Sequence, residues 1–138
     1  MIIIVCVDNN GGMMFNKRRQ SQDKKLRERI LDLTKDGRLL MNNYSYKLFG
    51  NSPQIKADDN FLENCTKDDF CFVENSDVLQ YKEKIQKIII YKWNRSYPSD
   101  LKFPISFDKE WKLVSTENFA GSSHDNITEE VYEKLNSK

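Results

Sequence analysis

A chain of 138 residues with 38% hydrophobic and 31% charged side chains has the length of one domain, with a modest core beneath a well-solvated surface. Its 12% aromatic content argues against a disordered chain. No run approaches the roughly 18 to 20 apolar residues of a membrane span, so we expect no membrane partner. The N-terminus lacks a basic leader with a small-residue cleavage site, and we therefore expect a cytoplasmic protein.

The net charge of +1 conceals an uneven distribution of charged residues. Residues 1–50 carry ten Lys and Arg against five Asp and Glu, whereas residues 51–138 carry twelve against sixteen. The first part therefore has a formal charge of +5 and the second part a charge of −4. This asymmetry predicts an N-terminal half that attracts anions.

In chain order, the first predicted element is a strand over Ile2–Val7, whose near-continuous apolar run indicates burial on both faces. The run Asp8–Asn16 follows, and its Gly-Gly pair predicts a glycine-hinged loop at the end of that strand. Ligands of open α/β sheets bind at such a place. Ser21–Asp36 has the apolar spacing of a helix, with Ser21 or Asp23 as its N-cap.

The middle and end of the chain continue this alternation. The further predicted elements are strands over Arg38–Met41, Phe70–Val73 and Lys87–Trp93, helices over Tyr44–Phe49, Asn60–Cys65 and Asp77–Ile85, and an irregular segment over Gly50–Asp59. Trp111–Phe119 and Ile127–Leu135 are predicted strands joined by a turn-rich loop, which is typical of a hairpin. We predict one α/β domain over residues 1–138, with a single mixed central sheet, helices on both faces and a C-terminal antiparallel hairpin.

The three cysteines do not predict a metal site. Cys6, Cys65 and Cys71 are odd in number and lack C-x-x-C spacing. Cys6 and Cys71 lie inside apolar runs, so we expect small buried hydrophobes in a reducing compartment. A zinc site would need these cysteines together with His124, the one histidine of the chain, and we expect no bound metal.

This order of elements resembles the dihydrofolate reductase fold. Lys87–Pro104 is similar to that family's strand, acidic connection and Asp-x-x-Phe-Pro segment, and Trp111–Ser115 follows at the family's spacing. Glu130–Leu135 resembles the closing strand, and Ile2–Asn16 resembles the first strand with its mobile Gly-Met loop. The resemblance covers most of the chain except Gly50–Asp69.

The resemblance implies a pterin-like ligand site. Members of the family hold the pterin with a carboxylate early in the first long helix, and Asp23 stands in that place. With a raised pKa, this carboxyl would anchor and protonate the ring; alternatively, Asp23 only stabilises the helix N-terminus through charge–dipole attraction. Further ligand contacts are implied for Val5, Gly12, Met13, Phe15, Arg18, Asn42, Ser45 and Tyr91, the last in place of a substrate-side threonine.

Three departures from the family's pattern affect the dinucleotide site. Glu74-Asn75-Ser76 stands where the family has a Gly-Gly pair beside the cofactor diphosphate, and a carboxylate is unfavourable there. Asn42-Asn43 replaces a Gly-Arg whose charge contacts phosphate. The segment between Phe49 and Phe70 is about one strand too short for the family's adenosine pocket. We therefore expect a degraded cofactor site and no tightly bound cofactor, with NADPH used only if the chain is a divergent reductase.

Three functions follow from these observations. The first is a dihydrofolate reductase-like protein that has lost ordinary NADPH-dependent reduction and binds a small molecule or a protein partner as a regulatory module. The second is a divergent NAD(P)H-dependent reductase of a pterin or another flat heterocycle, with Asp23 as the proton-supplying anchor. The third is anion or nucleic-acid binding by the basic residues of Lys17–Arg29, which otherwise form a solvated helix face.

Hydrolytic chemistry receives little support from the sequence. Ser122, Ser123, His124 and Asp125 are the residue types of a hydrolytic triad, but neighbours in one loop do not easily adopt the required geometry. Gly11–Ser21 is similar to short chains described as ribonuclease Z. That enzyme resembles a two-zinc metallo-β-lactamase and needs a His-x-His-x-Asp-His motif, which a chain with one histidine lacks.

Two segments carry expectations about ligand and partner binding. Asn10-Gly11-Gly12 should be the most mobile ordered segment and should close over a bound ligand, because its glycines restrain the backbone least. Trp93 and Tyr97 flank an arginine after a strand. They form either a stacking or partner-binding surface or a cover for the edge of the sheet.

Overall fold

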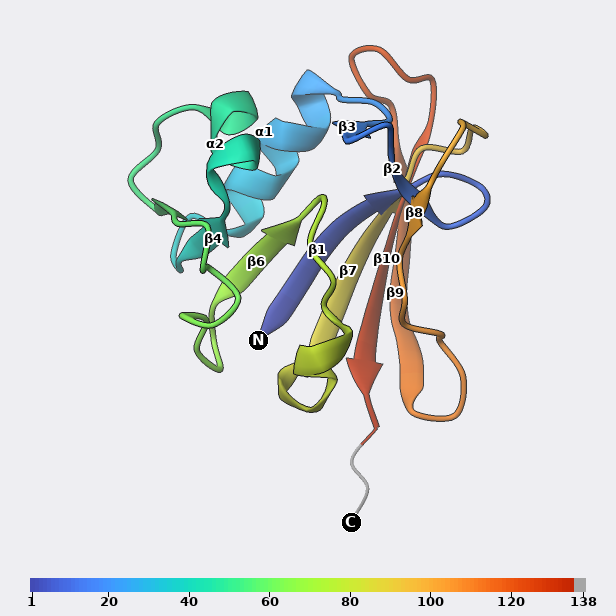
Figure 1. Ribbon diagram of the computed structural model, residues 1–138. Helices are drawn as coiled ribbons and strands as arrows, with labels where there is room; N and C mark the ends of the chain where they lie inside the picture. Colours follow the sequence, from blue (N-terminus) through green and yellow to red (C-terminus); the bar gives the residue numbers. More distant parts are fainter. Residues whose placement is uncertain (136–138) are drawn as a thin grey trace.

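The computed structural model describes residues 1–135 and contains two sheets (Figure 1). The larger sheet comprises β1 (Ile2–Val7), β4 (Leu39–Met41), β5 (Ile55–Ala57), β6 (Phe70–Val73), β7 (Lys87–Lys92), β9 (Trp111–Phe119) and β10 (Ile127–Lys134), and the smaller sheet comprises β2 (Gly12–Phe15), β3 (Arg18–Arg19) and β8 (Leu101–Lys102). The helices are α1 (Lys24–Leu33), α2 (Asn43–Phe49) and the 3₁₀ helix η1 (Leu79–Lys84). The spatial orders are β5-β4-β6-β1-β7-β10-β9 and β3-β2-β8.

Strand β1 lies at the centre of the larger sheet. It pairs in parallel with β6 on one side and with β7 on the other. Its residues are all apolar because both faces of the strand are covered. Strand β10 runs antiparallel to β7 and to β9. The mixed sheet and the C-terminal antiparallel hairpin predicted from the sequence are therefore confirmed.

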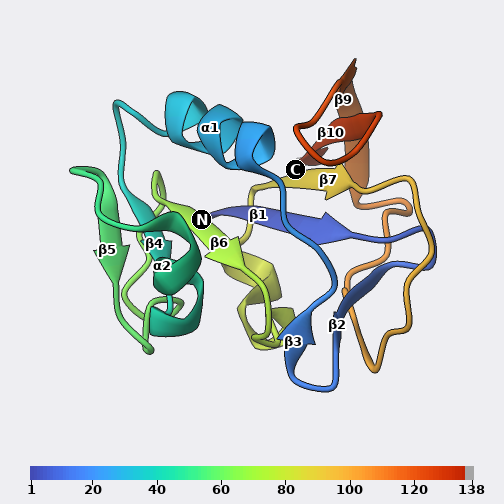
Figure 2. The same ribbon diagram turned by 90° about the horizontal axis from the view of Figure 1, so that it is seen from above.

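Two hydrophobic cores lie on opposite faces of this sheet. Ile3 of β1 belongs to one core, together with Val78 and Ile85 at the two ends of η1. Ile4, which points the other way, belongs to the second core with Leu26 of α1. Figure 2 shows α1 over one face and the yellow-green η1 segment over the other. Helical segments therefore cover both faces, as predicted.

Several predicted helices are shorter than expected. Helix α1 begins at Lys24 because the side chain of Asp23 accepts a hydrogen bond from the N–H of Leu26, 3.1 Å away, and so caps the first turn. The helix predicted over Asp77–Ile85 is only the 3₁₀ helix η1, whose start has no side-chain cap. Asn60–Cys65 forms turns instead of a helix, and the segment predicted to be irregular contains β5.

The predicted loop over Asp8–Asn16 is wrong in its second half, which is β2. This strand pairs with β3, the next strand of the chain, and with β8, which lies nearly ninety residues further along the chain. The connection from β2 to β3 is a two-residue turn at Asn16 and Lys17, with φ values of 54° and 62°. The glycine pair signalled a loop, but pairing with a distant strand outweighed that local signal.

The cysteines also differ from expectation. Cys71 is joined to Cys65 by a disulfide, so the prediction of a free buried thiol at Cys71 is wrong. Cys6 is free, and burial raises the pKa of its thiol. Within residues 1–135, no helix is long and apolar enough to cross a membrane. In the same range, no group of three or more His, Cys, Asp or Glu side chains could hold a metal ion.

Candidate functional site

A narrow cleft lies at the carboxyl ends of β1 and β6, between α1 and α2. Its walls are formed by Cys6, Met13, Arg19, Gln20, Ser21, Gln22, Asp23, Leu26, Arg27, Ile30, Leu48, Phe49, Phe72, Val73, Glu74 and Trp93. Ligands of open α/β sheets bind at this position. Its cavity volume is about 20 Å³, room for about one water molecule. A flat ring can therefore enter only if side chains of the walls move.

One wall of the cleft is built around the buried carboxylate of Asp23. Its Oδ1 accepts from the N–H of Leu26 and from the N–H of Ser122, and its Oδ2 accepts from the N–H of Ser123 at 2.9 Å and from His124 Nδ1 at 3.0 Å. The hydroxyls of Ser122 and Ser123 donate to the same two oxygens at 3.2 Å. Both oxygens are therefore saturated by the helix start and by the loop before β10.

The charge of Asp23 follows from these contacts. Burial by itself raises the pKa of Asp23, but hydrogen bonds from the N–H of Ser123, from His124 and from the N–H of Ser122 outweigh it. The pKa is therefore held well below its ordinary value, and the group is ionised at neutral pH. A carboxylate in this state accepts hydrogen bonds strongly and is a poor proton donor.

Gly121 permits the close approach of this loop to Asp23. A Cβ atom at Gly121 would lie 2.8 Å from Cγ of Asp23 and 2.9 Å from Cδ1 of Ile127. Those distances are shorter than any ordinary contact between carbon atoms. A glycine is therefore needed for the loop to bring the N–H groups of Ser122 and Ser123 onto the carboxylate.

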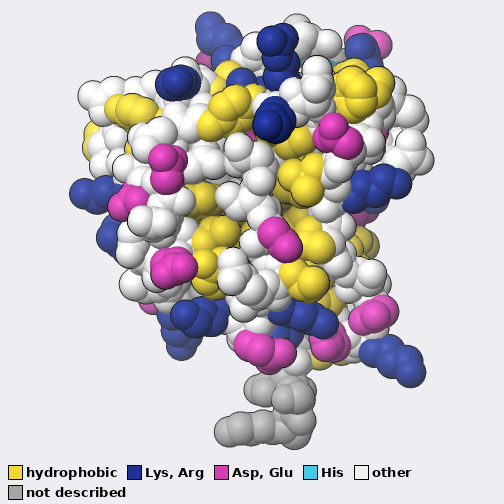
Figure 3. Space-filling view, viewed as in Figure 1, with side chains coloured by type: hydrophobic (Ala, Val, Ile, Leu, Met, Phe, Trp, Pro, Cys, Tyr) yellow, Lys and Arg dark blue, Asp and Glu magenta, His cyan; other side chains and the backbone are white. Residues whose placement is uncertain are grey.

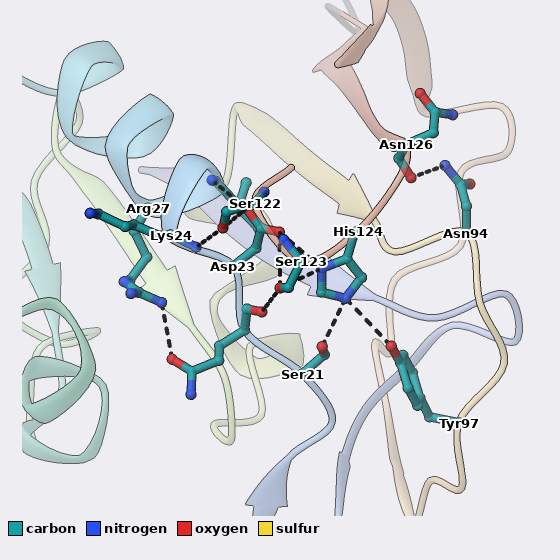
Figure 4. A network of polar contacts seen from close by, with 12 residues as sticks. Ser21, Asp23, Lys24, Arg27, Asn94, Tyr97, Ser122, Ser123, His124 and Asn126 are labelled. Atoms are coloured by element: carbon teal, nitrogen blue, oxygen red, sulfur yellow. Dashed lines mark hydrogen bonds and ion pairs between the residues drawn. The ribbon is translucent and has the colours of Figure 1, made fainter. Parts of the chain in front are cut away.

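The imidazole of His124 connects Asp23 to Ser21. Figure 4 shows the ring with Asp23 and Ser123 on its Nδ1 side and with Ser21 and Tyr97 on its Nε2 side. The Ser21 hydroxyl lies 2.9 Å from Nε2, and the Tyr97 hydroxyl lies 3.4 Å from it. Trp93 stacks on the ring with centroids 4.5 Å apart, which fixes its plane. Trp93 is thus a buried core residue and not an exposed partner surface.

The opposite wall is built around Glu74, immediately after β6. Arg19 of β3 binds this carboxylate with two parallel hydrogen bonds of 2.7 and 2.9 Å. The hydroxyl of the buried Ser45 in α2 donates to the same carboxylate at 2.7 Å. The guanidinium of Arg19 also lies over the ring of Tyr44, at 4.4 Å. The hydrogen bonds that Arg19 donates to Glu74 raise the pKa of Arg19, so its guanidinium stays charged.

The other residues predicted to bind ligand are dispersed. Val5 is buried in the core that contains η1, and Tyr91 is buried in the other core with its hydroxyl donating to Glu129 at 2.7 Å. Phe15 and Arg18 are exposed at the β2–β3 turn. Asn42 caps α2, Asn75 accepts from its side-chain amide, and Gly12 is buried in β2 beside Met13, which lines the cleft.

The basic residues of Lys17–Arg29 do not form one free patch. Arg19 is paired with Glu74, and Arg29 is paired with Glu117 and Glu129 at 2.8 and 2.9 Å. The remaining members are divided between the β2–β3 turn and α1. Figure 3 shows Lys and Arg side chains at the upper end, the sides and the lower end of this face, with Asp and Glu side chains among them.

Sequence reasoning missed the pairing of Ser21 with His124, because 103 residues separate them. It also missed Arg19 as the partner of Glu74, and Gln20 as part of the cleft. Within residues 1–135, only Gln20 Oε1 and Trp111 Nε1 are buried side-chain polar atoms without a partner. A buried acceptor without a partner is a feature that no local sequence pattern predicts.

Comparisons with known proteins support the fold. No family model matches the sequence, and no curated protein matches it. The structure is similar to dihydrofolate reductase from Enterococcus faecalis complexed with NADP(H) and RAB-propyl, with a TM-score of 0.71 and 9% sequence identity. The match covers 98% of this chain and 96% of that chain. At this identity the similarity is one of fold, and the chain therefore has a dihydrofolate reductase-like fold.

Proposed function

We propose that this dihydrofolate reductase-like protein does not carry out ordinary NADPH-dependent reduction and that it binds a small ligand in the cleft between α1 and α2. The observation that carries the proposal is the ion pair of Arg19 and Glu74. The resemblance to the reductases implies a diphosphate beside residues 74–76, where they have glycines. In this chain that place holds a carboxylate.

The cofactor's diphosphate does not fit the residues present here. Arg19 is already bound to Glu74 and is therefore not free to bind an incoming diphosphate, and a Glu74 carboxylate released from Arg19 and Ser45 would repel the diphosphate. Binding would require this ion pair to break and the carboxylate to leave its three hydrogen bonds. Breaking a half-buried pair of this kind weakens cofactor affinity directly, because its cost is subtracted from the binding free energy.

The alternative, a divergent reductase of a flat heterocycle, needs Asp23 to present its carboxyl to the ligand and to supply a proton. Both oxygens of Asp23 are engaged by the loop at Gly121–His124 and by the start of α1. Its pKa is lowered, whereas proton donation at neutral pH needs a raised one. These contacts favour a structural role for Asp23 and a function without reduction.

A small ligand is favoured by the composition of the cleft. Leu26, Ile30, Phe49 and Phe72 supply apolar surface, and Gln20 supplies a buried oxygen with no donor among residues 1–135. Apolar walls with one or two unsatisfied polar atoms are typical of sites for small molecules. The expected ligand therefore has a small apolar body and an N–H or O–H group that donates to Gln20.

Hydrogen exchange tests this proposal without assuming a reaction. Amide exchange of residues 9–22 is compared with and without a library of nucleotides, pterins and small heterocycles. A compound that binds in the cleft should slow exchange over Gln20–Gln22, and a Gln20→Ala variant should lose that protection. If every compound leaves these amides unchanged, the proposal of a small-ligand site is contradicted, and recognition of a protein partner replaces it.

A further inference from the structure

Three side chains at the mouth of the cleft form a chain of hydrogen bonds that the proposed function does not use. The Ser21 hydroxyl lies 2.9 Å from Nε2 of His124, and Nδ1 of the same ring lies 3.0 Å from Oδ2 of Asp23. The fold brings together a hydroxyl, an imidazole and a carboxylate from two segments that lie about a hundred residues apart in the sequence. This order of atoms is that of a nucleophile, a general base and a group that orients the base.

The carboxylate is placed to orient the imidazole. The side chain of Asp23 is completely buried, and that of His124 is 3% exposed. Because the ionised carboxylate only accepts hydrogen bonds, Nδ1 is the ring nitrogen that carries a proton and donates to Asp23. In the tautomer that a general base needs, Nε2 has no proton. The lone pair of Nε2 then faces the Ser21 hydroxyl. Stacking on Trp93 prevents the ring from turning away from this arrangement.

The hydroxyl is also within reach of a substrate. Ser21 is half-buried and lines the cleft, whereas the imidazole behind it is buried. The next residue, Gln22, is exposed, and its backbone N–H donates to no protein acceptor within residues 1–135. In several acyl-transfer enzymes, the N–H of the residue after the nucleophile stabilises the oxyanion. The N–H of Gln22 is the donor at the corresponding place in the sequence.

We propose that Ser21, His124 and Asp23 form a catalytic triad that hydrolyses carboxylic esters with small acyl groups. The Ser21 oxygen forms a bond to the acyl carbon while its proton passes to Nε2 of His124. The ester bond then breaks, and the alcohol leaves with that proton. Water then attacks the acyl-serine and gives a proton to Nε2 of His124. As the bond between the acyl carbon and the Ser21 oxygen breaks, His124 returns that proton to the serine oxygen, and the carboxylic acid leaves. The narrowness of the cleft favours the smallest acyl groups.

This inference goes beyond the proposed function, since ester hydrolysis requires no nicotinamide. The Tyr97 hydroxyl competes with the Ser21 hydroxyl for Nε2 of His124, because it lies 3.4 Å from that atom. A Tyr97→Phe variant removes this competitor and leaves the Ser21–His124 contact in place. Its rate of ester hydrolysis should therefore equal or exceed that of the unchanged protein.

A fluorophosphonate probe tests the triad on the unchanged protein, because such probes react covalently with activated serine hydroxyls. Peptide mass spectrometry should locate the modification at Ser21 among the serines of the chain. Hydrolysis of p-nitrophenyl acetate should fall at least about 100-fold in Ser21→Ala. It should be unchanged in Ser96→Ala, which alters an exposed serine of a neighbouring loop. Circular dichroism establishes that both variants are folded.

Two results would overturn the proposal: a Ser21 that the fluorophosphonate leaves unmodified, or an esterase rate that Ser21→Ala does not reduce. The labelling needs no variant, so misfolding of Ser21→Ala cannot conceal the answer. A separate titration with NADPH distinguishes this inference from the proposed function. Labelled Ser21 supports the triad whether or not NADPH binds, and tight NADPH binding contradicts only the proposed function.

Discussion

The two walls of the cleft hold carboxylates in different ways. Asp23 is completely buried and is held by three backbone N–H groups together with three side-chain donors, whereas Glu74 is 10% exposed and is held only by the side chains of Arg19 and Ser45. Backbone donors are fixed by the fold, but side-chain donors can rotate away. The wall at Asp23 should therefore be rigid and essential for stability, and the wall at Glu74 should be able to open.

Removing the carboxylate of the rigid wall should cause the largest loss of stability. Replacing Asp23 with Ala leaves the buried N–H of Leu26 and the part-buried N–H groups of Ser122 and Ser123 without their acceptor, and we expect a loss of about 3 kcal/mol in the free energy of unfolding. The matched control is Asp36→Ala, an exposed carboxylate just after α1, which should cost less than about 0.5 kcal/mol. Urea unfolding followed by circular dichroism measures both. A loss below about 1 kcal/mol for Asp23→Ala would show that the loop does not depend on this carboxylate.

Acid should weaken the fold without a mutation, at Asp23 and at a second buried carboxylate, Asp69, which lies just before β6. Hydrogen bonds hold the pKa of Asp23 below its ordinary value, and the ion pair with Arg38, against the opposing effect of burial, lowers the pKa of Asp69 to about 2. In the unfolded chain both groups titrate near 3.8. Below about pH 4 the unfolded state therefore binds more protons than the folded state, so the free energy of unfolding decreases as the pH falls.

We expect Asp69 alone to account for about 1 to 2 kcal/mol of this loss between pH 5 and pH 2. Urea unfolding at a series of pH values measures the slope, and Asp69→Asn should reduce it. A stability that is the same at pH 6 and pH 3 would contradict the account of both carboxylates.

Removing the charge of Glu74 in the movable wall should cause a smaller loss of stability. Because Arg19 and Glu74 are near the surface, Glu74→Gln should cost about 1 kcal/mol, and a double-mutant cycle with Arg19→Gln should give a coupling energy of similar size. Hydrogen exchange of the β3 amides should nevertheless become faster in both variants. A coupling energy near zero would mean that the ion pair does not hold this side of the cleft closed.

The difference between local and long-range contacts explains which features could be predicted from the sequence. The apolar run of β1 and the paired strands of the C-terminal hairpin follow from local patterns, and these elements were predicted within about one residue. The cap at Asp23 was one of two interpretations, and local geometry supports it. The partners of Asp23 could not be predicted, because they come from a loop that the fold, and not the local sequence, places beside α1.

The strands β2 and β3 were missed for a similar reason. Gly11 and Gly12 signal a loop locally, but β2 pairs with β8 through contacts between segments far apart in the chain. Glu74 was recognised as unusual beside a phosphate, yet its partner Arg19 was assigned to a general basic cluster. Sequence patterns therefore drew attention to Glu74, and the structure supplied the ion pair that holds it.

Calorimetric titration with NADPH tests the central claim most directly. With Glu74 paired to Arg19, the account predicts no binding tighter than about 100 µM, a binding free energy of about 5.5 kcal/mol. The Glu74→Gly variant is the matched comparison, because it frees Arg19 and removes the carboxylate, and it should bind NADPH more tightly than the unchanged protein. A dissociation constant of about 1 µM or lower for the unchanged protein, about 8 kcal/mol, would contradict the claim that this chain has lost ordinary NADPH-dependent reduction.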